Sequence, residues 1–125
     1  MKQIKLRSIM TNSENETTNV ETIGNYFEET KTITYKEEDL FITINIFEDS
    51  IKILRKNEDY NLNLEFKLSK KINCNYEVKS VGLNINLLVI TNKLEIKDKY
   101  IYIHYDLFNE ENYIGNFEYK LIFWE

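Results

Sequence analysis

The sequence predicts an all-β protein: a small antiparallel β-barrel, mainly up-and-down, with about nine to eleven strands and little helix. Apolar and polar residues alternate along almost the whole chain, as they do in strands with one buried face. Short acidic and Asn-rich steps separate the alternating runs, so consecutive strands can pair as hairpins. The chain also has no alanine, the best helix former, and is rich in Ile, Tyr and Phe, which favour strands.

The alternation is clearest in the middle of the chain. Leu40, Ile42, Ile44 and Ile46 share one face of a strand, and the run from Tyr60 to Leu68 repeats the pattern. We expect strands at 2–10, 18–28, 31–36, 39–47, 50–56, 60–68, 72–79, 82–91, 93–97, 99–107 and 113–124. Closure into a barrel would remove the exposed edges that such apolar strands otherwise present.

Composition and charge bound the function. The 125 residues suit a single domain, 1–125, and a charged fraction of 30% with an apolar fraction of 42% is typical of a globular protein. We expect a cytoplasmic protein that does not bind membranes, because no run approaches the roughly 18 apolar residues of a membrane span. The net charge of -5 and the short basic cluster around Lys70 argue against nucleic acid as a partner.

The usual signatures of cofactor and metal chemistry are missing. Cys74 is the single cysteine and His104 the single histidine, so the sequence predicts neither a disulfide nor a metal site. Three isolated glycines do not make a phosphate-binding loop, and we expect no cofactor. On strand parity Cys74 lies on an apolar face, where a free cysteine usually behaves as a small hydrophobe.

Arg55 is the most informative polar residue. It has the same parity as Ile51 and Ile53, which places a guanidinium at the edge of an apolar face, where it needs paired acceptors. The favoured interpretation is a structural arginine that closes one end of the barrel or extends past the turn. The alternative is a contact with an anionic ligand.

Several tyrosines fall on faces assigned to the core: Tyr35, Tyr60, Tyr76, Tyr105, Tyr113 and Tyr119. Their hydroxyl groups need partners if they are buried, so they could line a cavity or fill the barrel. The favoured interpretation is a filled barrel.

Catalytic groups are few. His104 shares a polar face with Asp106, which could orient the imidazole as a general base, although a solvent-facing histidine is the favoured interpretation. The adjacent carboxylates at Glu28–Glu29, Glu37–Glu38 and Glu110–Glu111 point to opposite faces of a strand or lie solvated in turns, so acid catalysis by these pairs is not expected.

Four stretches resemble the YwiB-like family of uncharacterised bacterial proteins, and their order and spacing cover nearly the whole chain. They are the runs 33–37 and 51–55, the segment 82–91, and the ending 101–107 with 115–117. The resemblance implies a calycin-like barrel, the fold of lipocalins, and no established activity. The family's glycine is expected at position 57, where this chain has Asn57.

These observations lead to two hypotheses of function. The first is a non-enzymatic barrel that binds a small amphipathic ligand or a protein partner, with Arg55, Tyr35, Tyr76 and Tyr105 as candidate ligand-binding residues and a homodimer as a possible assembly. The second is an enzyme with a minimal site at His104 or Arg55.

Overall fold

The computed structural model describes residues 1–125, which form a closed barrel of ten antiparallel strands. The strands are β1 (Lys2–Asn12), β2 (Thr17–Phe27), β3 (Thr32–Glu37), β4 (Leu40–Ile46), β5 (Ser50–Lys56), β6 (Tyr60–Lys67), β7 (Lys71–Val78), β8 (Leu83–Lys97), β9 (Tyr100–Asn109) and β10 (Asn112–Trp124). Each strand pairs with the next in sequence, and β1 pairs with β10 to close the barrel. The predicted up-and-down barrel is confirmed.

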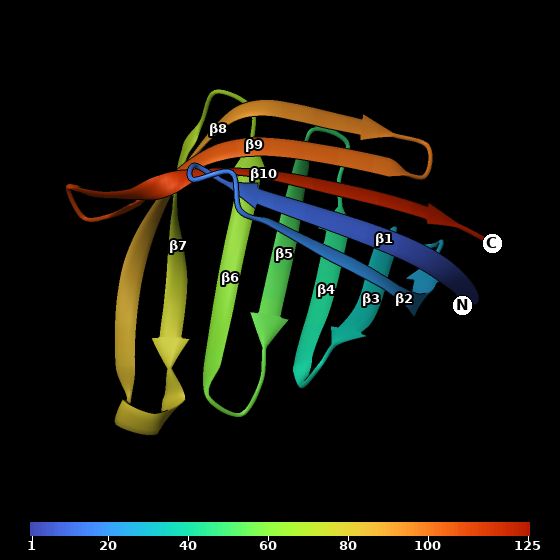
Figure 1. Ribbon diagram of the computed structural model, residues 1–125, viewed down its shortest axis with the longest axis horizontal. Helices are drawn as coiled ribbons and strands as arrows, with labels where there is room; N and C mark the ends of the chain where they lie inside the picture. Colours follow the sequence, from blue (N-terminus) through green and yellow to red (C-terminus); the bar gives the residue numbers. More distant parts are fainter.

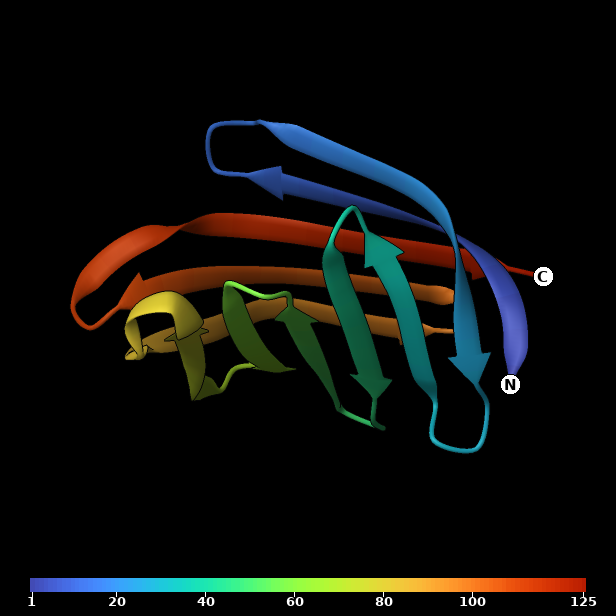
Figure 2. The ribbon, with the colours of Figure 1, turned by 90° about the horizontal axis from the view of Figure 1, so that it is seen from below.

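The barrel is flattened into two layers whose strands cross steeply (Figure 1). One layer holds the long strands β1, β2, β9 and β10, and the other holds β3 to β7, with β8 bending from one layer to the other. Figure 2 shows the two layers one above the other, with β2 bending down at its end to reach β3. The only helix is the three-residue 3-10 turn η1 (Lys79–Val81). The structure has no helix with the length and hydrophobicity needed to cross a membrane.

β8 merges two of the predicted strands. The expected strands 82–91 and 93–97 are one strand, Leu83–Lys97, with a register shift against β9 between Thr91 and Lys93. A bulge of this kind reverses the alternation without ending the strand. The break in the apolar pattern therefore marks a bulge and not a turn.

The core is filled by the alternating apolar faces. Five side chains are completely buried, with an exposed fraction of 0%: Ile33, Ile44, Ile51, Val89 and Ile103. Seven more residues of these faces are also buried: Ile42, Ile53, Leu64, Phe66, Leu87, Tyr105 and Leu121. Four others are half-buried and pack against the core: Leu62, Tyr76, Ile85 and Phe117.

The prediction for Tyr113 is wrong. Its side chain is 56% exposed, because β10 has a register shift against β9 between Tyr113 and Gly115. The shift turns Tyr113 to the outer face, where it packs edge-on against Phe108. Counting alternate residues back from Phe117 passes through this bulge, so it assigns Tyr113 to the wrong face of the strand.

Asn57 replaces the expected glycine by using its side chain. Its Oδ1 accepts hydrogen bonds from the backbone N–H groups of Asp59 at 2.8 Å and Tyr60 at 3.0 Å. Asn57 is not among the residues with positive φ. The turn after β5 therefore needs the amide of Asn57 and not a left-handed backbone.

Candidate functional site

Arg55 lies one residue before the end of β5, beside Glu37, the last residue of β3. Its Nη2 donates to Glu37 Oε2 at 3.3 Å, and about three quarters of each side chain is buried. Glu37 was expected in a solvated carboxylate pair, but it ends β3 with its side chain turned toward the barrel interior. The guanidinium has no other hydrogen-bond partner within the protein.

Three tyrosines surround this ion pair. The hydroxyl groups of Tyr35 and Tyr119 are hydrogen-bonded at 2.9 Å. Burial raises the pKa of Tyr35, Tyr105 and Tyr119, and the positive charge of Arg55 opposes the rise in all three. A small cavity of about 100 Å³ adjoins the cluster and is lined by Ser8, Met10, Thr18, Val20, Glu37, Arg55 and Tyr119.

The structure thus brings together three of the four predicted ligand-binding residues, Tyr35, Arg55 and Tyr105. The fourth, Tyr76, is half-buried and packs edge-on against Tyr60, with ring centroids 5.6 Å apart. Tyr105 packs between Phe66 and Phe117, at centroid distances of 4.7 and 5.4 Å. The aromatic rings thus pack closely beside Arg55, and the cavity next to the guanidinium is small, at about 100 Å³.

Cys74 lies where two strands separate. The pairing of β6 with β7 ends at Asn63–Asn75, and beyond it the Cys74 Sγ accepts the backbone N–H of Glu65 at 3.4 Å. The thiol is buried, and burial raises its pKa. A thiol in this state is a weak nucleophile.

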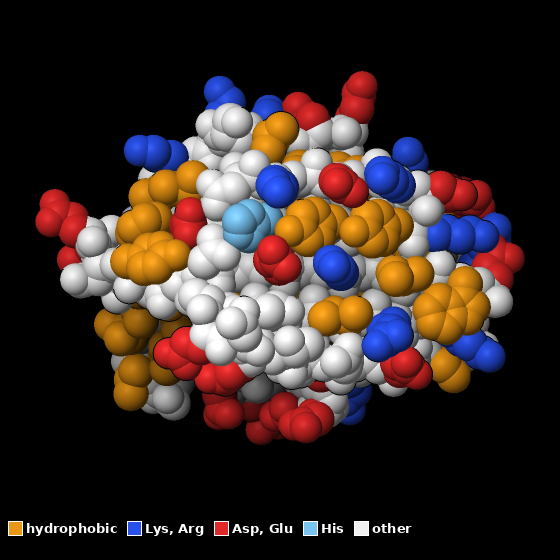
Figure 3. Space-filling view, turned by 45° about the horizontal axis from the view of Figure 1, so that its top comes forward, with side chains coloured by type: hydrophobic (Ala, Val, Ile, Leu, Met, Phe, Trp, Pro, Cys, Tyr) orange, Lys and Arg blue, Asp and Glu red, His pale blue; other side chains and the backbone are white.

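His104 lies on the outer face, where Figure 3 shows the imidazole in pale blue among aromatic and charged side chains. Its Nε2 lies 2.8 Å from Asn116 Oδ1, which must accept, so Nε2 carries the proton. Asn116 Nδ2 in turn donates to Asp106 at 2.9 Å. Asp106 therefore reaches the imidazole only through Asn116, and not directly as strand parity suggested.

Asp106 is the centre of this surface network. It also accepts hydrogen bonds from Tyr113 at 2.8 Å and from Asn92 at 3.0 Å. Partial burial raises the pKa of Asp106, but the three hydrogen bonds outweigh it and the net shift is downward. No three His, Cys, Asp or Glu side chains gather where they could hold a metal ion.

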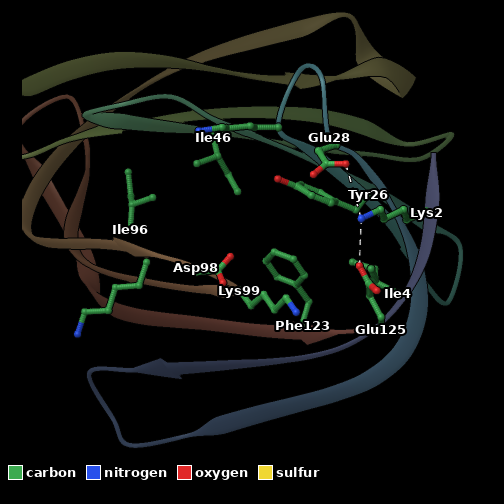
Figure 4. A pocket seen from close by; sticks show the side chains of 12 residues that line it. Lys2, Ile4, Tyr26, Glu28, Ile46, Ile96, Asp98, Lys99, Phe123 and Glu125 are labelled. Atoms are coloured by element: carbon green, nitrogen blue, oxygen red, sulfur yellow. Dashed lines mark hydrogen bonds and ion pairs between the residues drawn. The ribbon is translucent and has the colours of Figure 1, made fainter.

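A hollow that the sequence did not predict lies at the opposite end of the barrel from Arg55. We call it the mouth; its volume is about 560 Å³. It is lined by Lys2, Ile4, Tyr26, Glu28, Lys31, Ile46, Ile96, Lys97, Asp98, Lys99, Phe123 and Glu125. Figure 4 shows Ile46, Ile96 and Phe123 around a central space, with Tyr26 and Lys2 to one side. The floor is apolar and the rim is charged.

Two rim lysines are held next to the floor by their own backbone. The carbonyl of Lys31 accepts the N–H of Ile46 at 3.0 Å, and the carbonyl of Lys99 accepts the N–H of Phe123 at 3.1 Å. Neither ammonium group has an ion-pair partner within 4.0 Å, whereas Lys2 contacts both Glu28 and Glu125. Lys31 and Lys99 are therefore free cations beside an apolar surface.

The remaining charges of the rim nearly balance. Lys97 pairs with Glu95 at 3.5 Å, outside the mouth. Asp98 has no ion-pair partner and offsets one of the two free lysines. The mouth thus keeps a small excess of positive charge.

The mouth was missed because its residues come from five separate parts of the chain. Each one looks ordinary in sequence: the apolar residues belong to alternating strands, and the lysines belong to polar turns. One signal is that Lys31 and Lys99 lie in the β2–β3 and β8–β9 turns, which fall at the same end of an up-and-down meander. The predicted candidates lie instead at the Arg55 end.

Comparisons with known proteins agree with the fold and name no activity. A crystal structure of the ywiB protein from Bacillus subtilis is similar, with a TM-score of 0.70 and 17% sequence identity, over 96% of this chain and 89% of that one. No curated protein matches the chain. The sequence model of a family described as a domain of unknown function, DUF1934, matches residues 4–121. The resemblance to YwiB-like proteins is thus confirmed, and the chain belongs to the DUF1934 family.

Proposed function

We propose that the protein binds a short amphipathic anion at the mouth. The observation that carries this proposal is the pair of lysines without ion-pair partners, Lys31 and Lys99, on the rim of an apolar hollow of about 560 Å³. An anionic head group would meet the two ammonium groups, and its apolar part would cover Ile46, Ile96 and Phe123. Each contact satisfies a group that is otherwise left to water.

The ligand's apolar part is short. Below the mouth the barrel is closely packed, with Ile33, Ile44, Ile101 and Leu121 at most 1% exposed. A long chain has no internal channel to enter, so only the floor of the mouth is available. The proposal is therefore a shallow site for a compact amphipath.

The residues of the mouth and the surroundings of His104 favour binding over catalysis. The lining of the mouth includes no histidine, cysteine or serine. His104 hydrogen-bonds only to Asn116 and lies on the outer face, and it lines neither the mouth nor the cavity beside Arg55. An enzyme that used His104 as its base would need the imidazole at the hollow that receives the substrate.

A pair of probes with the same tail and opposite charge tests the proposal. Isothermal titration with octanoate and with octylammonium should show saturable binding of octanoate at one site and weaker or no binding of octylammonium. If only burial of the alkyl tail drove binding, the two probes would bind with equal affinity. Absence of saturable octanoate binding, or tighter binding of octylammonium, would contradict the proposal.

Matched variants locate the site. Lys31→Gln with Lys99→Gln should weaken octanoate binding roughly two- to fivefold per lysine, as expected for exposed ion pairs. Asp98→Asn should strengthen binding, because it removes the opposing charge. The control, Lys36→Gln with Lys56→Gln at the other end of the barrel, should leave binding unchanged. An equal loss in the control would place the probe elsewhere.

A further inference from the structure

β2 has a free edge in an otherwise closed barrel. It pairs with β1 from Thr17 to Tyr26, but it pairs with β3 only from Gly24 to Phe27. The segment Thr17–Ile23 is therefore bonded on one side only, and no other backbone hydrogen bond reaches it. Figure 2 shows this part of β2 along the border of its layer, before the strand bends toward β3. We call this segment the free edge.

The free edge lacks the features that usually prevent edge pairing. Natural edge strands carry lysine, proline or a bulge. This segment has no lysine and no proline, and its register with β1 is continuous. Five of its seven residues are β-branched, which suits strand pairing: Thr17, Thr18, Val20, Thr22 and Ile23. Its only charged residue, Glu21, lies 3.7 Å from Arg7 Nε on the neighbouring strand.

We propose that the free edges of two copies of this chain pair with each other and join two barrels into a symmetric dimer. Antiparallel pairing over the full segment places the central residue, Val20, on the two-fold axis. Glu21 then lies opposite Asn19 of the partner subunit, so no like charges face each other and an amide meets a carboxylate.

A second copy fits this edge better than an unrelated strand would. The segment is complementary to itself in the antiparallel direction, as an isologous interface requires. Pairing of the two free edges also uses the unpaired backbone N–H and C=O groups of both copies. No free edge then remains for a third copy, so the assembly stops at a dimer. The interface lies away from the mouth, so dimerisation and octanoate binding are independent properties.

Cysteine cross-linking tests the position of the axis. In a Cys74→Ser background, Val20→Cys should form an intermolecular disulfide under mild oxidation, because directly opposed strand residues have Cα atoms about 4.5–5.5 Å apart. Ile23→Cys is the control. It is 57% exposed, but it is three residues from the axis, so its two copies are roughly 20 Å apart and should not cross-link. Equal cross-linking of the two variants would overturn the proposal.

A charge exchange tests the interface without cross-linking. Native mass spectrometry of the wild type should show a dimer whose fraction rises with protein concentration. Val20→Lys and Val20→Asp should each be monomeric, since like charges then meet at the axis, and an equal mixture should form the heterodimer. The heterodimer shows that both variants fold. A wild type that stays monomeric at every concentration, or a Val20→Lys protein that remains dimeric, would refute the pairing.

Discussion

At the scale of one residue, strand alternation predicts the direction of the Arg55 side chain but not its partner. Its position after Ile51 and Ile53 predicts an inward guanidinium that needs acceptors, and the structure supplies one acceptor, Glu37. The partner was not predictable, because Glu37 is 18 residues away on another strand. The surrounding tyrosines complete a polar cluster inside an apolar barrel.

Replacing Arg55 by Met should destabilise the fold by about 1–3 kcal/mol, because the largely buried carboxylate of Glu37 loses its only cation. Adding Glu37→Gln should recover part of this loss, since a neutral amide tolerates burial better. Urea unfolding of the wild type, the single variant and the double variant measures both effects. An Arg55→Met protein as stable as the wild type would mean that the ion pair has no structural role.

The buried tyrosines predict a loss of stability in alkali. Burial raises the pKa of Tyr35, Tyr105 and Tyr119, whereas the same groups ionise near pH 10 in the unfolded chain. Below pH 10 the three tyrosines make their full contribution to the free energy of unfolding. Above it, the free energy of unfolding should fall by about 1.4 kcal/mol per pH unit for each tyrosine.

Tyr105→Phe isolates one of these groups, because it keeps the ring contacts with Phe66 and Phe117. Urea unfolding between about pH 9 and 11 should give a shallower decline for this variant than for the wild type. Identical slopes would show that Tyr105 ionises equally well in the folded protein.

At the scale of the elements, the alternation predicts strand positions well and fails at bulges. Leu40–Ile46 and Ser50–Lys56 lie within about a residue of their predicted bounds. The bulges in β8 and β10 are the exceptions: one strand was divided in two, and Tyr113 was assigned to the wrong face. A bulge is set by cross-strand register, so a single strand's sequence does not reveal it.

Gly24 has the clearest structural role of the glycines. It lies where β2 begins to pair with β3, and a Cβ atom there would approach the Thr34 carbonyl oxygen to 2.6 Å and Leu6 Cδ2 to 2.9 Å. Gly24→Ala should therefore destabilise the fold by about 1–3 kcal/mol in chemical denaturation. Gly115→Ala is the control, because its Cβ would meet only side-chain atoms at 3.2 Å or more. A larger effect at Gly115 would contradict this explanation.

At the scale of the whole molecule, the sequence predicts the barrel but not the mouth. The alternation specifies which face of each strand is buried, and the short turns specify that consecutive strands pair with each other. The mouth depends on where five separate parts of the chain meet after the barrel has closed and bent into two layers. That arrangement follows from strand lengths, bends and register together, none of which is visible in one segment.

The closure of the barrel by β1 and β10 also has a consequence for how the chain folds. Nine of the ten strand pairings join consecutive strands, so they can form by local zippering, and only the β1–β10 pairing joins the two ends of the chain. The entropy cost of a long loop therefore falls almost entirely on one step. We therefore expect substitutions of side chains between β1 and β10, such as Leu6 and Leu121, to speed unfolding more than they slow folding.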